Sequence, residues 1–267
     1  MTHTTSTETP DSPLQLERDG AVAILRFNRP AALNAVNVPM AQGLLAAARE
    51  LTSDPSVRAI VLCGVGKGFM AGGDLATLRA NPRQGATDLL GPLHEALTVF
   101  AAMDAPLIAQ VHGVAAGAGL SLMLQADFVI AAEGTRFNMA YVNIGASCDV
   151  GASWALPRLV GLRRALEISM LGETLTCAQA QQLGLVNRVV PATELEPEVK
   201  ALAQRLAKGP TVALGHLRRL MRESFDRDLP SQLAAEAAAF VQCTQTEDFK
   251  TGIDAFFAKQ PAQFVGH

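Results

Sequence analysis

The sequence is poor in aromatic residues and carries only a small net charge, −3 at pH 7. Its 267 residues include one tryptophan and one tyrosine, and Lys plus Arg (22) nearly balance Asp plus Glu (25). Nonspecific binding to nucleic acid needs a basic surface, which this balance does not supply, so no nucleic-acid partner is expected. An anionic small ligand needs only a few local donors and remains open as a partner.

Cysteine is also scarce, and no segment has the pattern of a membrane span or a secretory signal. The four cysteines form no C-x-x-C pair and no zinc-like cluster with histidine, so no metal site is expected and free thiols in the cytoplasm are the simplest interpretation. No apolar run reaches the roughly 18 residues that a membrane helix needs. Met1–Pro13 is rich in Thr and Ser and lacks basic and apolar signal regions, which predicts a disordered lead-in over residues 1–13.

The remaining chain alternates between short apolar runs and segments of helical spacing. Strands are expected over Ala21–Phe27, Val57–Cys63, Leu107–Val111 and Asp127–Ala132. Helices are expected over Met40–Leu51, Leu89–Met103 and Leu120–Gln125. This alternation predicts parallel βαβ units, hence an α/β core over residues 14–198.

From Trp154 onward the pattern is nearly all helical, with one short strand expected within Leu185–Val190. Residues 199–267 form amphipathic helices rich in Ala and Leu, and we interpret them as a helical oligomerisation region. The alternative, that their apolar face packs on the chain's own core, stays open at this stage.

Two loops rich in Gly and Ala follow two of the expected strands: Met70–Leu75 and Gly113–Gly119. Small residues allow the backbone to approach a ligand closely. One backbone N–H from each loop could hold a developing oxyanion. The alternative is two tight turns that pack helices on a sheet. Gly64–Phe69 is neither a dinucleotide loop nor a P-loop, because Phe69 replaces the required Gly or Ser/Thr.

Several pieces of the chain, in order and spacing, carry a resemblance to a known family. They are Asn28–Ala35, Gly68–Leu75, Ala109–Leu120, Ala126-Asp127, Leu156–Gly161 and Ala180–Val186. From about Leu14 to Phe264 the sequence resembles the crotonase, or enoyl-CoA hydratase/isomerase, family. The resemblance implies a spiral of ββα units with a helical C-terminal region, assembled as a homotrimer or as a hexamer made of two trimers.

The resemblance also implies a site for an acyl-coenzyme A thioester. The thioester carbonyl would lie between the N–H groups of Gly73 and Ala118. Coenzyme A, as part of the substrate and not as a separate cofactor, would contact six residues: Ala31, Ala32, Leu33, Ala71, Asp74 and Leu75. Family members often carry Lys or Arg at the place of Ala31, so phosphate contacts here would be fewer or come from elsewhere. The side chain of Asp74 is expected to have a structural role as a loop or cap residue.

The acids and bases decide which reaction such a site performs. The two positions where family hydratases carry glutamates hold Ser121 and Tyr141, whose pKa values are unsuited to activating water near neutral pH. Asp149 resembles the single aspartate of enoyl-CoA isomerases similar to those of phenylacetate catabolism. The sequence therefore predicts a double-bond isomerase in which Asp149 moves the proton, in a partly apolar pocket with Ile144, Val150 and Trp154.

Other interpretations remain open. Asp149 could instead cap the helix expected near Gly151–Leu159. The related 4-chlorobenzoyl-CoA dehalogenases use an aspartate nucleophile at this position, a histidine at the place of His94 and an aromatic residue at the place of Tyr141. His94 could also be a packing or solvent-facing residue, and Tyr141 and Trp154 could be core aromatics. A hydratase, or a weakly catalytic acyl-CoA-binding member, completes the alternatives.

Overall fold

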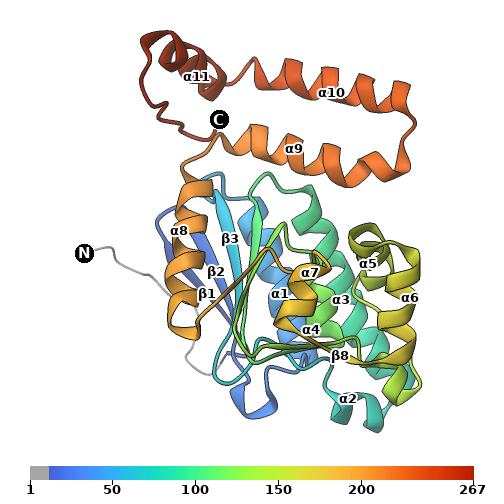
Figure 1. The fold of residues 1–267 in the computed structure, drawn as a ribbon. Helices are drawn as coiled ribbons and strands as arrows, with labels where there is room; N and C mark the ends of the chain where they lie inside the picture. The colour runs from blue at the N-terminus through green and yellow to red at the C-terminus, as the bar shows by residue number, and fades with distance from the viewer. Residues whose placement is uncertain (1–11) are drawn as a thin grey trace.

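We describe the fold from a computed structural model, which covers residues 12–267 of the chain. A larger sheet is sandwiched between helices, and a group of C-terminal helices extends away from this core (Figure 1). The larger sheet has six strands in the order β1-β2-β3-β4-β6-β9. Their bounds are β1 (Leu14–Asp19), β2 (Val22–Phe27), β3 (Ala59–Gly64), β4 (Leu107–Val111), β6 (Phe128–Ala132) and β9 (Arg188–Val190).

The strands from β2 onward pair in parallel, as the alternating pattern predicted, whereas β1 and its antiparallel pairing were not predicted. β1 and β2 form an antiparallel hairpin, and every later pairing in the larger sheet is parallel. Parallel strands need crossover connections, which the intervening helices supply. A second sheet has three strands in the order β5-β7-β8: β5 (Val114–Ala116), β7 (Arg136–Asn138) and β8 (Thr174–Thr176). The predicted α/β spiral is confirmed.

Helices cover both faces of the larger sheet (Figure 1). The first eight have these bounds: α1 (Val38–Thr52), α2 (Leu75–Ala80), α3 (Pro82–Ala102), α4 (Ala118–Met123), α5 (Ala152–Val160), α6 (Leu162–Leu171), α7 (Cys177–Gln182) and α8 (Leu195–Ala207). The main core lies on the side of α1 and α3, and a smaller apolar cluster joins α8 to the opposite face. Strands buried on both faces explain runs such as AIVLC in β3, which contain no polar residue.

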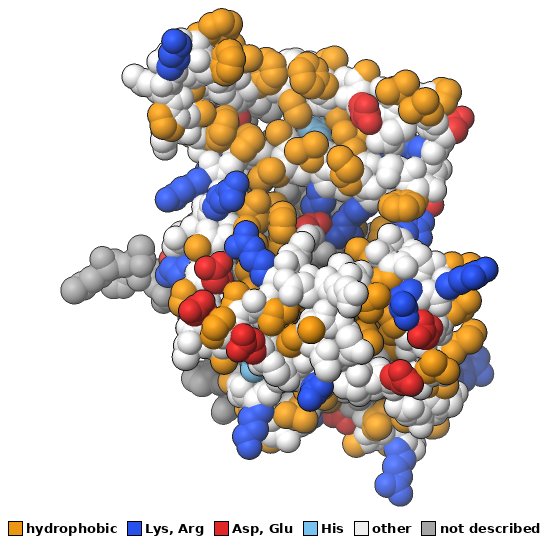
Figure 2. Space-filling model, viewed as in Figure 1, with side chains coloured by type: hydrophobic (Ala, Val, Ile, Leu, Met, Phe, Trp, Pro, Cys, Tyr) orange, Lys and Arg blue, Asp and Glu red, His pale blue; other side chains and the backbone are white. Residues whose placement is uncertain are grey.

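The last three helices are α9 (Thr211–Glu223), α10 (Leu229–Cys243) and α11 (Glu247–Ala258). They stand above the core in Figure 1 and expose many large apolar side chains, which Figure 2 shows gathered over this part of the molecule. Among the exposed residues are Leu217, Met221, Phe225, Leu229, Leu233, Phe240, Phe256 and Phe257. The predicted start of the C-terminal region at residue 199 falls inside α8, which packs on the sheet.

Two helix boundaries differ from the sequence-based expectation. α3 begins at Pro82 and not near Leu89, because Asn81 caps it and Pro82 occupies its first turn. α4 spans Ala118–Met123, two residues earlier than expected. Strand β1, the three strands of the smaller sheet and helix α2 were not predicted, because elements of three to six residues are too short to show a period.

Other expectations from composition have separate outcomes. The predicted lead-in over residues 1–13 lies outside the described residues except for Ser12 and Pro13. The carbonyls of these two residues accept hydrogen bonds from Asn28. The four cysteines are free, as predicted. Within residues 12–267, no helix is long and apolar enough to cross a membrane.

Candidate active site

A cavity of about 680 Å³ lies where the two glycine-rich loops meet α2, α3 and the loop before α5. Its wall is mainly apolar, with Leu75, Leu89 and Leu93 among the lining residues. A few polar groups converge on it, which is the usual composition of a small-molecule site. The residues that carry potential chemistry there are Gly73, Ala118, His94, Tyr141, Cys148 and Asp149.

The first glycine loop is held in an extended conformation against the segment before α1. Val36 donates a hydrogen bond to the Gly72 carbonyl and accepts one from the Asp74 amide, both at 2.8 Å. Gly73 lies between these two bonds in a parallel bridge with Val36. In the described part of the chain the Gly73 N–H makes no backbone hydrogen bond, and it lines the cavity. It is therefore available to a ligand.

The second glycine loop leads from β5 directly into α4. The Gly117 N–H donates to Asn138 at 2.9 Å, and Gly117 adopts a left-handed φ of 49° that favours glycine. Ala118 is the first residue of α4, so its N–H has no partner within the helix. Among the described residues this amide donates no backbone hydrogen bond either. Two unused amides, from Gly73 and Ala118, thus line one cavity.

The two loops lie close because residues between them are small. A side chain on Gly119 would bring its Cβ within 2.2 Å of the Met70 carbonyl oxygen, so only glycine fits there. Asn34, fully buried, adds a second restraint on the first loop: its amide donates to the carbonyls of Val65 and Gly68 at 2.9 and 2.8 Å. Sequence reasoning missed Asn34 as a positioning residue, although asparagine is a residue that tolerates its positive φ of 58°.

Opposite the loops, three side chains form a continuous chain of hydrogen bonds. The Tyr141 hydroxyl donates to Asp149 Oδ1, and it also contacts Ser121 Oγ at 2.9 Å. Ser121 Oγ in turn donates to the Gly117 carbonyl at 3.1 Å. Ser121 is fully buried, Tyr141 is buried, and Asp149 is half-buried in the cavity wall. Ser121 and Tyr141, at the positions where the resemblance leads us to expect glutamates, are therefore connected to Asp149, the one carboxylate among the described residues of the cavity wall.

Burial dominates the protonation behaviour of this group. Desolvation raises the pKa of Asp149 above its ordinary value, against the opposing effects of the Tyr141 hydrogen bond and of His94. Desolvation also raises the pKa of Tyr141, and the neighbouring Asp149 charge acts in the same direction. Tyr141 consequently stays a neutral donor, while Asp149 holds its proton more tightly than an exposed aspartate does.

His94 lies on α3 and also lines the cavity. Its Nε2 accepts a 3.4 Å hydrogen bond from the amide of Val150, the residue after Asp149. The residue is nevertheless exposed to solvent. The structure thus combines the two interpretations of His94, because the side chain is solvent-facing and also borders the candidate site.

The residues predicted to contact coenzyme A divide into two groups. Ala71 and Leu75 line the cavity, whereas Ala31, Ala32 and Leu33 lie on the neighbouring loop outside its wall. This loop is joined to the cavity by the Ala71 amide, which donates to the Leu33 carbonyl at 3.0 Å.

Asp74 has the structural role expected for its side chain. It caps α2 through the Ala76 amide at 3.0 Å and pairs with Arg29 at 2.9 Å. The same interactions lower the pKa of Asp74, while desolvation, the largest single influence, opposes them.

Two expectations about Asp149 are resolved by the local geometry. The alternative that Asp149 caps α5 is wrong: the N-cap is Gly151, with no side-chain cap hydrogen bond. Ile144 and Val150 line the cavity as predicted, but the placement of Trp154 beside Asp149 is wrong. Trp154 points away from this site, stacks with Arg158 at 4.3 Å and lines a different cavity.

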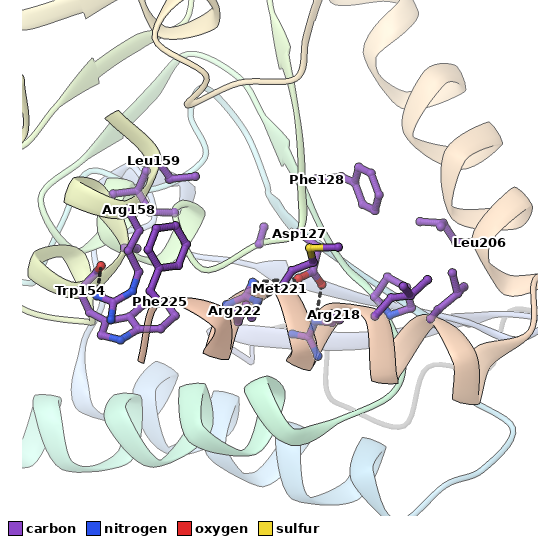
Figure 3. A pocket seen from close by; sticks show the side chains of 16 residues that line it. Asp127, Phe128, Trp154, Arg158, Leu159, Leu206, Arg218, Met221, Arg222 and Phe225 are labelled. Atoms are coloured by element: carbon purple, nitrogen blue, oxygen red, sulfur yellow. Dashed lines mark hydrogen bonds and ion pairs between the residues drawn. The ribbon is translucent and has the colours of Figure 1, made fainter. Parts of the chain in front are cut away.

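That second cavity, of about 450 Å³, separates α9 from the core (Figure 3). Its walls are mainly apolar but include Arg158 and a cluster in which Arg218 and Arg222 of α9 pair with Asp127, at 2.6 and 2.8 Å. This cluster fastens α9 to the end of the loop before β6. Neither glycine-rich loop lines the cavity, and its one carboxylate is occupied by two arginines, so we place no chemistry there.

Two glycine loops with unused amides and a half-buried carboxylate line one cavity, a set of groups that could stabilise an oxyanion. Comparison with known proteins shows the family. The family model "Enoyl-CoA hydratase/isomerase" matches residues 17–267. The chain belongs to the enoyl-CoA hydratase/isomerase family.

Individual relatives cover nearly the whole chain. One is the 1,2-epoxyphenylacetyl-CoA isomerase of Escherichia coli K12, 35% identical over 92% of this chain and 95% of that protein. The crotonyl-CoA hydratase of Syntrophomonas wolfei is 33% identical over 94% and 96%. Among solved structures, an enoyl-CoA hydratase from Polaromonas sp. JS666 has a TM-score of 0.89 and 33% identity over 94% of this chain and 99% of that one.

Proposed function

We propose that the protein is an enoyl-CoA double-bond isomerase in which Asp149 moves the proton. The observation that carries the proposal is that Asp149 is the single carboxylate among the described residues that line the cavity. A double-bond shift needs one base that removes a proton from one carbon and returns it to another. One residue can therefore carry out both proton transfers. Addition of water instead needs one group that activates the water and another that supplies a proton to the carbon.

The proposed reaction begins with a 3-enoyl-CoA whose thioester oxygen accepts from the N–H groups of Gly73 and Ala118. Asp149 removes a proton from C2, and the electron pair moves into the thioester to give a dienolate. The two amides stabilise the charge that develops on oxygen. Asp149 then returns the proton to C4, which yields the 2-enoyl-CoA. Coenzyme A enters as part of the substrate, held along Ala71, Leu75 and the exposed loop of Ala31, Ala32 and Leu33.

The geometry around Ser121 and Tyr141 supports isomerisation over hydration. Both hydroxyls are buried and bound to each other, so neither is placed to activate a water molecule. The raised pKa of Tyr141 makes it a still poorer base than a free phenol. Several relatives are named hydratases, including the crotonyl-CoA hydratase of Syntrophomonas wolfei. We therefore treat hydration as the main competing activity.

A second candidate function is nucleophilic displacement on a 4-halobenzoyl thioester. The observation that favours it is the position of His94. This side chain borders the cavity and accepts a hydrogen bond from the amide of Val150, the residue that follows Asp149. Asp149 would attack the ring carbon and halide would leave, after which water would release the hydroxylated product. The Tyr141 hydrogen bond weakens Asp149 as a nucleophile, which is why isomerisation takes precedence.

The exposed apolar side chains of α9 to α11 support an assembled state. Soluble monomers rarely expose contiguous apolar patches of this kind. We propose that a second copy of the chain covers this surface, as a homotrimer or a dimer of trimers.

The experiment that tests the proposed function is a turnover assay on a panel of acyl-CoA thioesters. The panel contains a 3-enoyl-CoA, crotonyl-CoA and 4-chlorobenzoyl-CoA, each assayed with the wild-type protein and with Asp149→Asn. Isomerisation of the 3-enoyl-CoA that depends on Asp149 is expected. Turnover of only crotonyl-CoA would assign hydration instead, and a covalent label on Asp149 from the halobenzoyl substrate would assign displacement. Binding without turnover of any thioester would indicate an acyl-CoA-binding protein.

A further inference from the structure

The hydrogen bonds behind the cavity connect the candidate base to one of the two candidate oxyanion donors. The chain runs from Asp149 through Tyr141 and Ser121 to the carbonyl oxygen of Gly117. The Gly117 carbonyl and the Ala118 N–H belong to the same peptide group. The chain therefore ends on the opposite side of the amide that lines the cavity.

Counting hydrogens shows that this chain can exist in two states. It contains three contacts between side chains or to the carbonyl, but the hydroxyls of Ser121 and Tyr141 supply only two hydrogens. When Asp149 is ionised, Tyr141 must donate to it, and Ser121 has one hydrogen to share between Tyr141 and Gly117. When Asp149 is protonated, all three contacts are satisfied. Asp149 then donates to Tyr141, Tyr141 donates to Ser121, and Ser121 donates to the Gly117 carbonyl.

The direction of the chain thus follows the proton. In the ionised state, the Ser121 hydrogen is drawn toward Tyr141, whose own hydrogen is committed to the carboxylate. In the protonated state, Ser121 accepts from Tyr141, so the single Ser121 hydrogen goes entirely to the Gly117 carbonyl. A donor on a peptide carbonyl polarises the whole peptide group, so its N–H becomes a stronger donor, and chains of such bonds reinforce one another.

We propose that Ser121 and Tyr141 form a relay that couples protonation of Asp149 to the donor strength of the Ala118 amide. The inference rests on the proposed function, because it assigns Asp149 as the proton acceptor and Ala118 as an oxyanion donor. When Asp149 takes the substrate proton, negative charge develops on the thioester oxygen at the same moment. The relay strengthens the Ala118 N–H at that stage and relaxes it when the proton returns. Ser121 and Tyr141 act through other groups and are positioning residues.

The contacts of Ser121 distinguish a relay from an ordinary helix contact. A serine in a helix often bonds the carbonyl four residues earlier, as Ser121 does with Gly117. Such a bond needs no second partner. Here Ser121 is fully buried and also contacts a buried tyrosine whose other contact is the carboxylate of the cavity. The same Gly117 oxygen already accepts from the Ser121 amide at 2.9 Å, so removing the hydroxyl leaves the carbonyl with a partner.

The test uses the infrared stretch of the thioester carbonyl, which reports how strongly the bound oxygen is hydrogen-bonded. The probe is butanoyl-CoA labelled with ¹³C at the carbonyl, a saturated thioester that cannot isomerise. It is measured at saturation across the pH range in which Asp149 titrates. In the wild-type protein we expect the stretch to move to lower wavenumber as Asp149 becomes protonated. In Ser121→Ala, Tyr141→Phe and Asp149→Asn this dependence on pH should disappear.

Thr135→Val is the matched control. Thr135 is another buried hydroxyl that donates to a backbone carbonyl, that of Ala132 at 2.7 Å, but it lies outside the cavity wall. It should keep the wild-type dependence on pH. With a 3-enoyl-CoA, Ser121→Ala should lower kcat about tenfold, the effect of roughly one hydrogen bond, and change KM by less than about twofold.

A wild-type stretch that does not change with pH would overturn the relay, as would a change that survives in Ser121→Ala. Failure of the proposed function has a different signature. If Asp149→Asn isomerises as fast as the wild type while the infrared dependence is present, the assignment of Asp149 as the base falls, and the coupling of its protonation to the Ala118 amide stands. If isomerisation depends on Asp149 but the carbonyl stretching frequency does not change with pH, the relay is wrong and the isomerase assignment stands.

Discussion

The Tyr141 hydroxyl donates a hydrogen bond to the carboxylate of Asp149 from a buried position in which it also contacts Ser121. A half-buried aspartate is thereby given a fixed orientation at the wall of the cavity. Orientation matters because a base that serves two carbons must reach both without rebuilding its surroundings. At the two positions where the resemblance leads us to expect glutamates in a hydratase, this chain has the hydroxyls of Ser121 and Tyr141, which lie beside the carboxylate of Asp149.

The first prediction concerns pH. Burial raises the pKa of Asp149, and only its ionised form can accept a proton. Isomerisation measured as kcat/KM should therefore fall as pH is lowered through this raised pKa, at a higher pH than an exposed aspartate would give. Replacing Tyr141 by Phe removes a hydrogen bond that lowers this pKa, so the acid limb should move to higher pH. A limb at the ordinary value of an exposed carboxyl would contradict the burial argument.

The second prediction concerns stability. A carboxyl whose pKa is raised in the folded state binds its proton more tightly there than in the unfolded chain. The free energy of unfolding is therefore larger at low pH, and it decreases as pH rises through the pKa of the folded state. Asp149→Asn removes this penalty and can still accept from Tyr141. Chemical denaturation at pH 8 should show that this variant is at least as stable as the wild type. A clear loss of stability would indicate that Asp149 is retained for folding.

The third prediction concerns addition of water. Hydration of crotonyl-CoA should be well below a typical enzyme rate of about 10 per second, because no second carboxylate among residues 12–267 lines the cavity. Ser121→Glu with Tyr141→Glu restores the residue types found in family hydratases and is the informative comparison, although the buried surroundings are not built for two charges. Wild-type hydration at about 10 per second or faster would show that the carboxylate argument is wrong.

The fourth prediction concerns assembly. Phe256 and Phe257 on α11 are 76% and 78% exposed, and burying them on a second copy would remove apolar surface from water. Light scattering at micromolar concentration should give the mass of a trimer or hexamer. The double variant Phe256→Asp, Phe257→Asp should shift it toward smaller species, whereas Glu194→Lys, an exposed charge change on η3 (Ala192–Glu194), should not. A monomeric wild type would contradict the proposed assembly.

The sequence predicted the central strands because their environment leaves a clear pattern. β3 and β4 are covered on both faces, so nearly every residue is apolar and the period is not needed to find them. β5, β7 and β8 have three residues each, and their pairing depends on partners far away in the chain. Local periodicity cannot show such pairings.

The sequence predicted which residues line the candidate site but not the hydrogen bonds that connect them. Glycine spacing and the family resemblance pointed to Gly73, Ala118 and Asp149, and all three line one cavity. The contact of Tyr141 with Ser121 joins residues 20 positions apart. The error over Trp154 has a related cause. Helix α5 begins at Ala152, and two residues later the helical rotation turns the side chain of Trp154 away from the preceding loop. Trp154 therefore lines the cavity beside α9 instead.

The most direct test of the account is a single-turnover isomerisation of a 3-enoyl-CoA deuterated at C2, with wild type and Asp149→Asn compared at saturating enzyme. In the wild type, part of the label lost from C2 should appear at C4, because one carboxyl carries it between the two carbons. Asp149→Asn should slow the reaction about 100-fold or more while thioester binding changes little. Near-equal rates for the two proteins would contradict it and would make His94 the next residue to test.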